Sequence, residues 1–416
     1  MNPAGYAGSP RGDWRTLLPG LLCGVLFLAC AAAAPLAPEY PPEATLTFTP
    51  MPAGVPLPEY LVPYLDPVCG TQVTRVADHA GMGSNQTVLA HHYAKDQPWN
   101  SDGTLIQLSG WPSAILDGRT YAFLRWIMPP GDHHVWSNTD PKRIYGIQQR
   151  HTWEWVDAGD GAVHPIRTFA EYTHLSLCEY EGNLSNDDRY AVFQATAPSG
   201  NWVLVYDMQQ DSVLARLNSG ALYPNNVTMS QSGNYVAIQW DVPGYGERAG
   251  IGIYPRDLSF VRNVGSCGGC HYDLGYDTEG HEVAVLTDID QSSRAIIAVR
   301  LEDGTRTTLL TDAQMSWYIH VSCRALNRPG WAYLSEFADP NTQTTKPNYQ
   351  LAFAVRIDGS GTVERFAQVH HSATVEYERA PFAVPNRDGD KMMFRSDWEN
   401  GAGPVYSYVA AMRDRR

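Results

Sequence analysis

Residues Ser230–Trp240 read SQSGNYVAIQW, a tight polar turn followed at once by an apolar run. Ser and Gly favour the turn, and the β-branched and aromatic residues of the run suit a pleated surface. The same succession of turn and apolar run occurs seven times along the chain. The seven turns are Asn100–Gly103, Asn138–Pro141, Ser185–Asp188, Ser230–Gly233, Asp277–Gly280, Asn327–Gly330 and Asn386–Gly389.

The spacing of these turns indicates the architecture. Their third residues stand at positions 102, 140, 187, 232, 279, 329 and 388. Repeats of about 40 to 50 residues are typical of propeller blades or of helical arrays, and the strand-forming runs exclude helices. We therefore predict an all-β protein, a seven-bladed β-propeller that occupies residues 60–416.

The composition limits the classes of partner. The 416 residues include 30 Lys and Arg against 44 Asp and Glu, a formal net charge of -14. No basic stripe interrupts this acidic balance, so we expect no nucleic-acid partner. Because a propeller is a large single domain, the length does not require further domains, and we expect a monomer.

The first 34 residues have the three parts of a secretory signal peptide. Arg11 and Arg15 precede the apolar run Leu17–Leu28, and the small residues Ala29–Ala34 offer a cleavage site. The apolar run is too short for a membrane span. Phe27–Cys30 also resembles a bacterial lipobox, so a lipid anchor at Cys30 is an alternative. We expect a secreted or periplasmic protein, or an outer-membrane lipoprotein, in which the Pro-rich residues 35–59 form a linker.

Histidines gather where the predicted inner strands begin. In a propeller these strands line the central channel, so their first residues lie at one mouth of it. Imidazole suits both metal binding and proton transfer near neutral pH. The histidines that fall in these windows are His91, His92, His133, His134, His271 and His320.

Cysteines accompany the histidines of two neighbouring blades, and zinc takes four ligands of these kinds in a closed tetrahedral site. We predict a structural zinc bound by His271, His320 and Cys323, with Cys270 as the fourth ligand. Cys267 and Asp273 are alternatives for that fourth position.

Two further interpretations of these cysteines remain open. A small disulfide between Cys267 and Cys270, or free buried thiols in place of a metal site, is one. The other is covalent attachment of a c-type haem, because Cys267–His271 spells C-x-x-C-H. Without the signal peptide five cysteines remain, so at least one is free, metal-bound or paired with another chain.

Three phrases of the chain resemble the propeller-fold polysaccharide lyases, namely the ulvan lyases and, more distantly, the oligogalacturonate lyases. They are HHYAKDQPWNSDG at His91–Gly103, PNRDG at Pro385–Gly389 and FRSDW at Phe394–Trp398. The resemblance extends over most of residues 65–412. It implies an exported lyase that cleaves a uronic-acid-containing, ulvan-like polysaccharide by β-elimination.

The resemblance also implies roles for particular residues. His92 and His134 stand where a base is expected. Tyr245 and Arg248 would serve as acid and as neutraliser of the substrate carboxylate, with Tyr172 as a second acid candidate. Where oligogalacturonate lyases have histidine ligands on the last inner strand, this chain has Ala380–Ala383 without an imidazole. The ulvan-lyase chemistry, in which His, Tyr and Arg act, therefore fits better than a metal-assisted mechanism, unless His370 or His371 supplies the missing imidazole. A non-catalytic exported propeller that binds a glycan or a protein is the alternative from another class.

Overall fold

The computed structural model describes residue 47 and residues 49–412, apart from 132, 178–180, 241–248, 267–270, 289–293, 316–318, 337–345 and 373–375. The described residues belong to one compact unit, Glu39–Arg416. The predicted signal peptide and Cys30 lie outside the described residues, as do Cys267, Cys270, Tyr245 and Arg248. Within the described part of the chain, no helix is long and apolar enough to cross a membrane.

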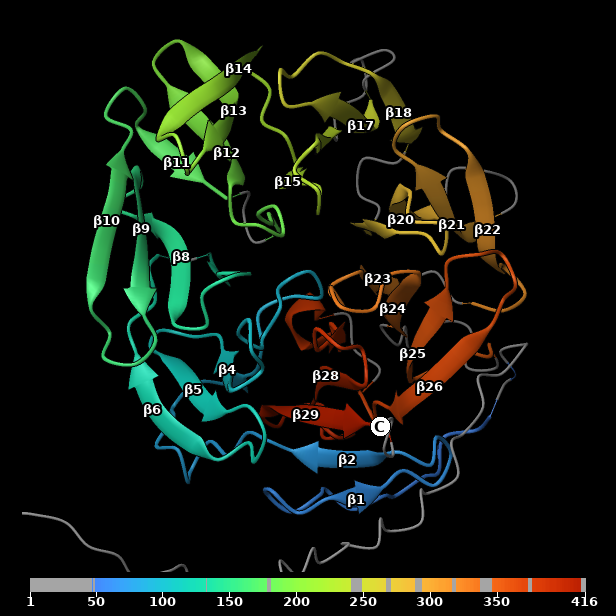
Figure 1. Cartoon of the computed structure of the whole chain (residues 1–416). Coiled ribbons are helices and arrows are strands. Elements are labelled where there is room, and N and C mark those ends of the chain that lie inside the picture. Colours follow the sequence, from blue (N-terminus) through green and yellow to red (C-terminus); the bar gives the residue numbers. More distant parts are fainter. Residues whose placement is uncertain are drawn as a thin grey trace, which may run out of the picture. The chain divides into compact units, whose positions relative to one another are not determined.

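The strands form seven sheets arranged as a ring, antiparallel except where β3 pairs in parallel with β29 (Figure 1). The first blade contains β4 (Leu105–Leu108), β5 (Ser113–Asp117) and β6 (Phe123–Ile127). The second contains β7 (His134–Trp136), β8 (Arg143–Gln148), β9 (Thr152–Asp157) and β10 (Val163–Thr168). The third contains β11 (His174–Ser176), β12 (Tyr190–Ala197), β13 (Gly200–Asp207) and β14 (Ser212–Gly220). The fourth contains β15 (Asn226–Met229), β16 (Tyr235–Trp240), β17 (Gly250–Pro255) and β18 (Arg262–Gly265).

The last three blades complete the ring. The fifth contains β19 (Tyr272–Tyr276), β20 (Glu282–Asp288), β21 (Ala295–Arg300) and β22 (Arg306–Thr311). The sixth contains β23 (Ile319–Ser322), β24 (Trp331–Glu336), β25 (Leu351–Arg356) and β26 (Val363–Gln368). The seventh contains β27 (Val384–Pro385), β28 (Lys391–Ser396) and β29 (Val405–Ala411), together with β1 (Tyr64–Leu65), β2 (Gln72–Arg75) and β3 (Val88–Leu89). The prediction of a seven-bladed, all-β propeller is confirmed.

The predicted polar turns lead into the second strands of the blades. Ser230–Gly233, for example, connects β15 to β16, and the Gly233 N–H donates a hydrogen bond of 2.9 Å to the Ser230 carbonyl. Gly233 has a φ of 74°, a left-handed conformation that glycine adopts without steric cost. The local turn chemistry therefore sets the period of the fold.

The first blade departs from the prediction. We expected an inner strand that begins at His91–His92, but the first sheet has only three strands and residues 91–97 are irregular. The Asp96 N–H donates a hydrogen bond of 3.1 Å to the Tyr93 carbonyl, which closes a turn inside this stretch. Only an isolated β-bridge between Trp99 and Ile106 follows. Pro98 interrupts the ladder because it has no N–H to donate. We call residues His91–Gln97 the central segment.

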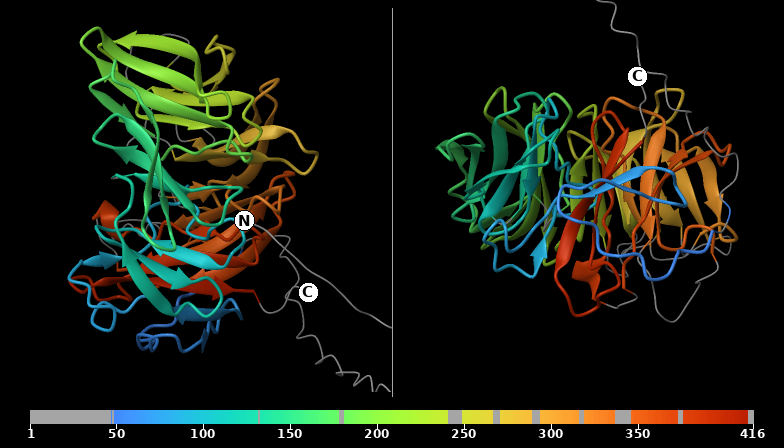
Figure 2. Two further views of the ribbon diagram at one scale, coloured as in Figure 1. Left: turned by 60° about the vertical axis from the view of Figure 1, so that its left-hand side comes forward. Right: turned by 90° about the horizontal axis from the view of Figure 1, so that it is seen from below.

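Strands from the two ends of the chain close the ring in the seventh blade. β2 pairs with β29 in an antiparallel register that places Thr74 opposite Val409. Figures 1 and 2 show this early strand beside the last strands of the chain. Met393 and Val409 of this blade pack with Ile106 and Leu116 of the first blade in one buried cluster.

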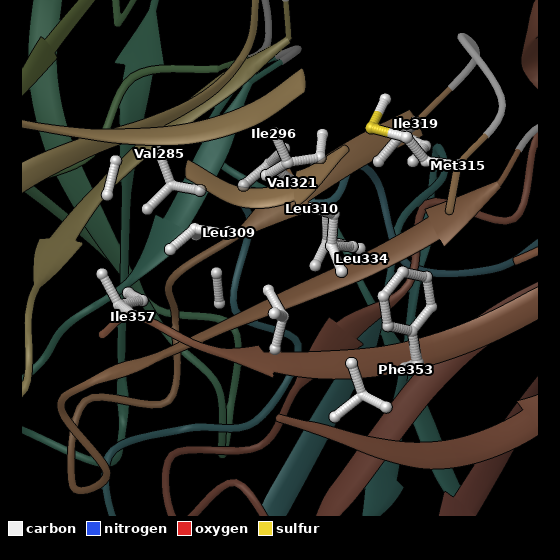
Figure 3. Packing of buried hydrophobic residues seen from close by; sticks show 14 of the residues in the cluster. Val285, Ile296, Leu309, Leu310, Met315, Ile319, Val321, Leu334, Phe353 and Ile357 are labelled. Carbon is white, nitrogen blue, oxygen red and sulfur yellow. The ribbon is translucent and has the colours of Figure 1, made fainter. Parts of the chain in front are cut away.

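Apolar side chains fill the spaces between neighbouring sheets. Between the fifth and sixth blades, Ile296 and Leu310 pack with Val321, Leu334 and Phe353 in one buried cluster (Figure 3). Burial of such side chains is the dominant stabilising contribution to the fold. This packing holds the inner strands, and the side chains at their ends, in fixed positions.

Candidate active site

The central segment is held by contacts with several blades. His91 Nε2 lies 2.5 Å from the Phe382 carbonyl oxygen, next to β27 of the seventh blade. Gln97 Nε2 donates to the carbonyl oxygens of Arg324, at 2.9 Å, and Pro385, at 3.0 Å. Lys95 forms an ion pair with Glu181, which precedes β12 of the third blade. These contacts from different sides place the segment at the centre of the ring.

His92, Asp96 and His133 form a group in which one carboxylate accepts from two imidazoles. His92 Nδ1 donates to Asp96 Oδ2, and His133 Nε2 lies 3.4 Å from Asp96 Oδ1. Burial raises the pKa of Asp96, but His133 and His92 outweigh burial and hold that pKa well below its ordinary value. Asp96 is therefore an ionised acceptor. Because His92 donates through Nδ1, its Nε2 is the basic nitrogen of the ring.

His134, at the start of β7, is a neutral imidazole at neutral pH. Burial, together with His133 and His92, lowers the pKa of His134 to about 3. Its Nδ1 lies 3.3 Å from the Gly131 carbonyl oxygen, which can only accept, so Nδ1 carries the proton.

A pocket of about 360 Å³ brings His91, His92 and His134 together with Arg395 of β28. We call it the Arg395 pocket. Arg395 is fixed there because its Nε donates to the Ala380 carbonyl at 2.8 Å and its guanidinium lies 3.9 Å from the centre of the Phe382 ring. A guanidinium beside imidazoles suits the binding of a carboxylate. The structure thus brings the two predicted bases together with an arginine that sequence reasoning missed.

A second pocket of about 270 Å³ lies between the first three blades, and we call it the Arg150 pocket. Arg150 and His174 line it, and Trp111 lines both this pocket and the Arg395 pocket. The two pockets are therefore neighbours on one face of the protein.

Tyr377 is the centre of another cluster. Its hydroxyl lies 3.2 Å from His271 Nε2, 3.1 Å from His320 Nε2 and 3.0 Å from the Tyr93 hydroxyl. The rings of His271 and His320 stack with their centres 4.1 Å apart. Burial lowers the pKa of His271, and burial and His271 hold the pKa of His320 well below its ordinary value. Both imidazoles are accordingly neutral hydrogen-bonding groups at neutral pH.

The structure brings together only two of the predicted zinc ligands. His271 and His320 are adjacent, but among the described residues Cys323 forms no three-ligand group with them. Residues three positions apart on a strand point to opposite faces, so Cys323 packs in the core behind His320. His271 also has both nitrogens engaged, with Nδ1 at 2.9 Å from the Ile319 carbonyl oxygen. The prediction of Cys323 as a ligand beside these histidines was wrong, and Cys270 lies outside the described residues.

Tyr172 is not placed where an acid would act. It is buried in the core beside the third blade, where the Arg216 guanidinium donates to its hydroxyl at 3.3 Å. It lines neither of the two pockets. The other predicted acid and neutraliser, Tyr245 and Arg248, lie outside the described residues.

Two groups of described residues could hold a metal ion. The first group consists of Asp277, Glu279 and His281. Arg300 already forms ion pairs with both carboxylates of this group, at 3.0 and 2.5 Å. No such cation pairs with Asp96 among the ion pairs of the described residues. Imidazole nitrogens and a carboxylate are ordinary ligands of divalent cations, so His92, Asp96 and His133 fit such an ion better.

Fold and site together define a seven-bladed β-propeller with a histidine- and arginine-lined pocket formed by the central segment and the seventh, first and second blades. No protein-family model and no curated protein matches the chain. Its fold is similar to that of an oligogalacturonate lyase from Vibrio parahaemolyticus, with 14% sequence identity, a TM-score of 0.58 and coverage of 84% of this chain and 96% of that one. An oligogalacturonate lyase in complex with manganese has 15% identity, the same TM-score and the same coverage. At these identities the similarity establishes the fold alone.

Proposed function

We propose that this protein is a polysaccharide lyase that cleaves a uronic-acid-containing glycan by β-elimination. The observation that carries the proposal is the Arg395 pocket, in which Arg395 and His92, itself hydrogen-bonded to Asp96, line one cavity. The similarity in fold to oligogalacturonate lyases is consistent with it.

In the proposed reaction Arg395 binds the substrate carboxylate and stabilises the negative charge that develops on it. His92 Nε2 takes the proton from C5. Asp96 keeps His92 in the required tautomer and stabilises the imidazolium that forms, as the carboxylate of a catalytic triad does. The electron pair of the C5–H bond becomes the C4=C5 double bond, and the C4–O bond breaks.

The proton then returns to the leaving oxygen. Of the described residues that line the Arg395 pocket, none is a tyrosine, and His134 has its basic nitrogen unprotonated. The His92 imidazolium is thus the proton donor that the pocket offers. One imidazole can act on both bonds only where C5–H and C4–O lie on the same face of the ring, as in glucuronate but not in galacturonate. This favours a glucuronate-containing substrate such as ulvan over polygalacturonate.

A divalent cation held by His92, Asp96 and His133 would act as a Lewis acid toward a carboxylate. It would also occupy His92 Nδ1. The structural zinc that we expected near His271, His320 and Cys270 remains a separate proposal, as do export through residues 1–34, a lipid anchor at Cys30 and a monomeric state.

The test is ultraviolet absorbance of the conjugated double bond while the mature chain is incubated with ulvan, polygalacturonate and glycosaminoglycans in parallel. We expect absorbance to rise with glucuronate-containing glycans. No rise with any of them, from a folded sample, would contradict lyase activity and favour a non-catalytic glycan-binding propeller.

A further inference from the structure

Trp111 stands between the two pockets and is open to solvent. It lies in the loop that joins β4 to β5, it is one of the residues that line both pockets, and it is 54% exposed. We propose that Trp111 is a stacking surface for a sugar ring and that the two pockets bind acidic groups on two neighbouring sugar units. The assignment of the Arg395 pocket to the cleaved unit rests on the proposed function.

The loop that carries Trp111 is held in place by its neighbours. Gln86 Nε2 donates to the Pro112 carbonyl at 3.1 Å, and Ser113 Oγ donates to the Gly110 carbonyl at 3.0 Å. A Cβ on Gly110 would come within 2.2 Å of Gln86 Oε1, so a larger residue there would displace the Gln86 side chain that holds the loop. The indole is therefore presented on a fixed backbone, which lowers the entropic cost of binding.

A sugar has the surface that such a ring recognises. Its axial C–H groups form an apolar face, which packs on an aromatic ring, while its hydroxyl and acidic groups project from the edge. Trp in an exposed position combines a large apolar area with few rotatable bonds. A ring stacked on Trp111 would direct its substituents toward the pockets that Trp111 lines.

The Arg150 pocket offers positive charge for the second unit. Arg150 has a left-handed φ of 67°, and its carbonyl oxygen accepts from the Leu175 N–H at 2.5 Å, so its backbone is anchored to β11. Among the ion pairs of the described residues, none involves Arg150. Its guanidinium, with His174 in the same pocket, is suited to a planar carboxylate or to a sulfate ester. Carboxylate and sulfate ester are both oxyanions, so the group that we expect this pocket to bind is an oxyanion on the sugar unit next to the one that is cleaved.

Binding can be measured apart from turnover in full-length protein that carries His92→Ala. Titration calorimetry would compare a glucuronate disaccharide and longer oligosaccharides, in sulfated, desulfated and carboxyl-reduced forms. We expect Trp111→Ala to weaken binding by about three- to tenfold and Trp111→Phe to weaken it less, because a smaller ring still stacks.

Arg150→Ala should weaken binding only of ligands that carry the second oxyanion, and Arg150→Lys should restore part of the loss. A loss on desulfation alone would identify sulfate as that group, and a loss on carboxyl reduction alone would identify carboxylate. Arg119→Ala is the matched control, because Arg119 is an exposed arginine in the turn after the far end of β5. The melting temperature of each variant would show that it is folded.

Binding that is unchanged by Trp111→Ala, or an effect of Arg150→Ala no larger than that of Arg119→Ala, would overturn the proposal. Absence of binding to every oligosaccharide would overturn it as well. Binding that depends on Trp111 and Arg150 in a protein whose unsubstituted form shows no turnover would support this inference while the lyase proposal fails.

Discussion

Lys95 and Glu181 form an ion pair at the centre of the ring, and the Lys95 side chain is only 1% exposed. The ammonium also lies 4.3 Å from the centre of the Tyr272 ring, on β19. Asn226 Nδ2 donates to the same Glu181 oxygen at 2.6 Å. Burial raises the pKa of Glu181, but Lys95 outweighs burial and lowers it, so the carboxylate stays ionised. The pair connects the central segment to the third, fourth and fifth blades.

Lys95→Met should therefore destabilise the protein. It removes one partner of the ion pair and leaves the Glu181 carboxylate without its compensating charge. We expect the free energy of unfolding in urea to fall by roughly 2 to 4 kcal/mol, at the lower end because the Glu181 side chain is 27% exposed. The double variant Lys95→Met/Glu181→Gln should recover part of this loss. Equal stability of the two variants would show that the unpaired charge is not the cause.

His92→Ala should lower turnover by about 100-fold or more, because it removes the general base. Asp96→Asn should have a similar effect with little change in shape, since an amide cannot stabilise the imidazolium. The rate of double-bond formation measures both, with circular dichroism as the check on folding. His134→Ala should also reduce turnover, because His134 lines the same pocket. Full activity of both histidine variants would exclude the Arg395 pocket from the reaction.

Zinc added in excess should inhibit the enzyme, because an ion bound by His92, Asp96 and His133 would replace the hydrogen bond between His92 Nδ1 and Asp96 that keeps the proposed base in the required tautomer. The inhibition constant for zinc should be at least about tenfold higher in His133→Ala, which lacks one ligand, than in the unsubstituted protein. The inhibition of each protein is measured relative to its own rate without zinc. His281→Ala, in the group compensated by Arg300, is the control and should leave the constant unchanged. Equal inhibition of all three proteins would place the zinc elsewhere.

The stability of the protein should fall in acid through its buried histidines. Burial, the largest influence, lowers the pKa of His91 to about 3, whereas an unfolded histidine titrates near about 6.5. Because the pKa of His91 is lower in the folded than in the unfolded protein, the contribution of His91 to the free energy of unfolding is complete above about pH 6.5. It is lost progressively as the pH falls toward about 3, at about 1.4 kcal/mol per pH unit. Urea unfolding between these limits should show a shallower pH dependence for His91→Gln than for the unsubstituted protein. Identical slopes would mean that His91 is solvated in the folded state.

The fold could be predicted because the spacing of its blades is set by turns whose residues are adjacent in the sequence. A turn such as Ser230–Gly233 needs only its own residues to form, and seven of them at blade spacing define the ring. The first blade could not be predicted in the same way. Its missing inner strand depends on contacts between the central segment and distant blades.

The site could be predicted in part for the same reason. Blade periodicity placed His92 and His134 at one mouth, and the structure brings them into one pocket. Arg395 and Trp111 join them from the seventh and first blades, which no local pattern connects. The error over Cys323 was one of strand parity, since a spacing of three from His320 turns the thiol into the core.

The closure of the ring by β2 and β29 has a consequence for the order of folding. A ribosome releases β2 long before β29, so the edge of β2 that pairs with β29 stays unpaired until Val405–Ala411 has been synthesised. Pairing between such distant segments is slow and leaves an unpaired edge exposed in the meantime. The β2 edge of a nascent chain would therefore be open to pairing with other chains during that interval.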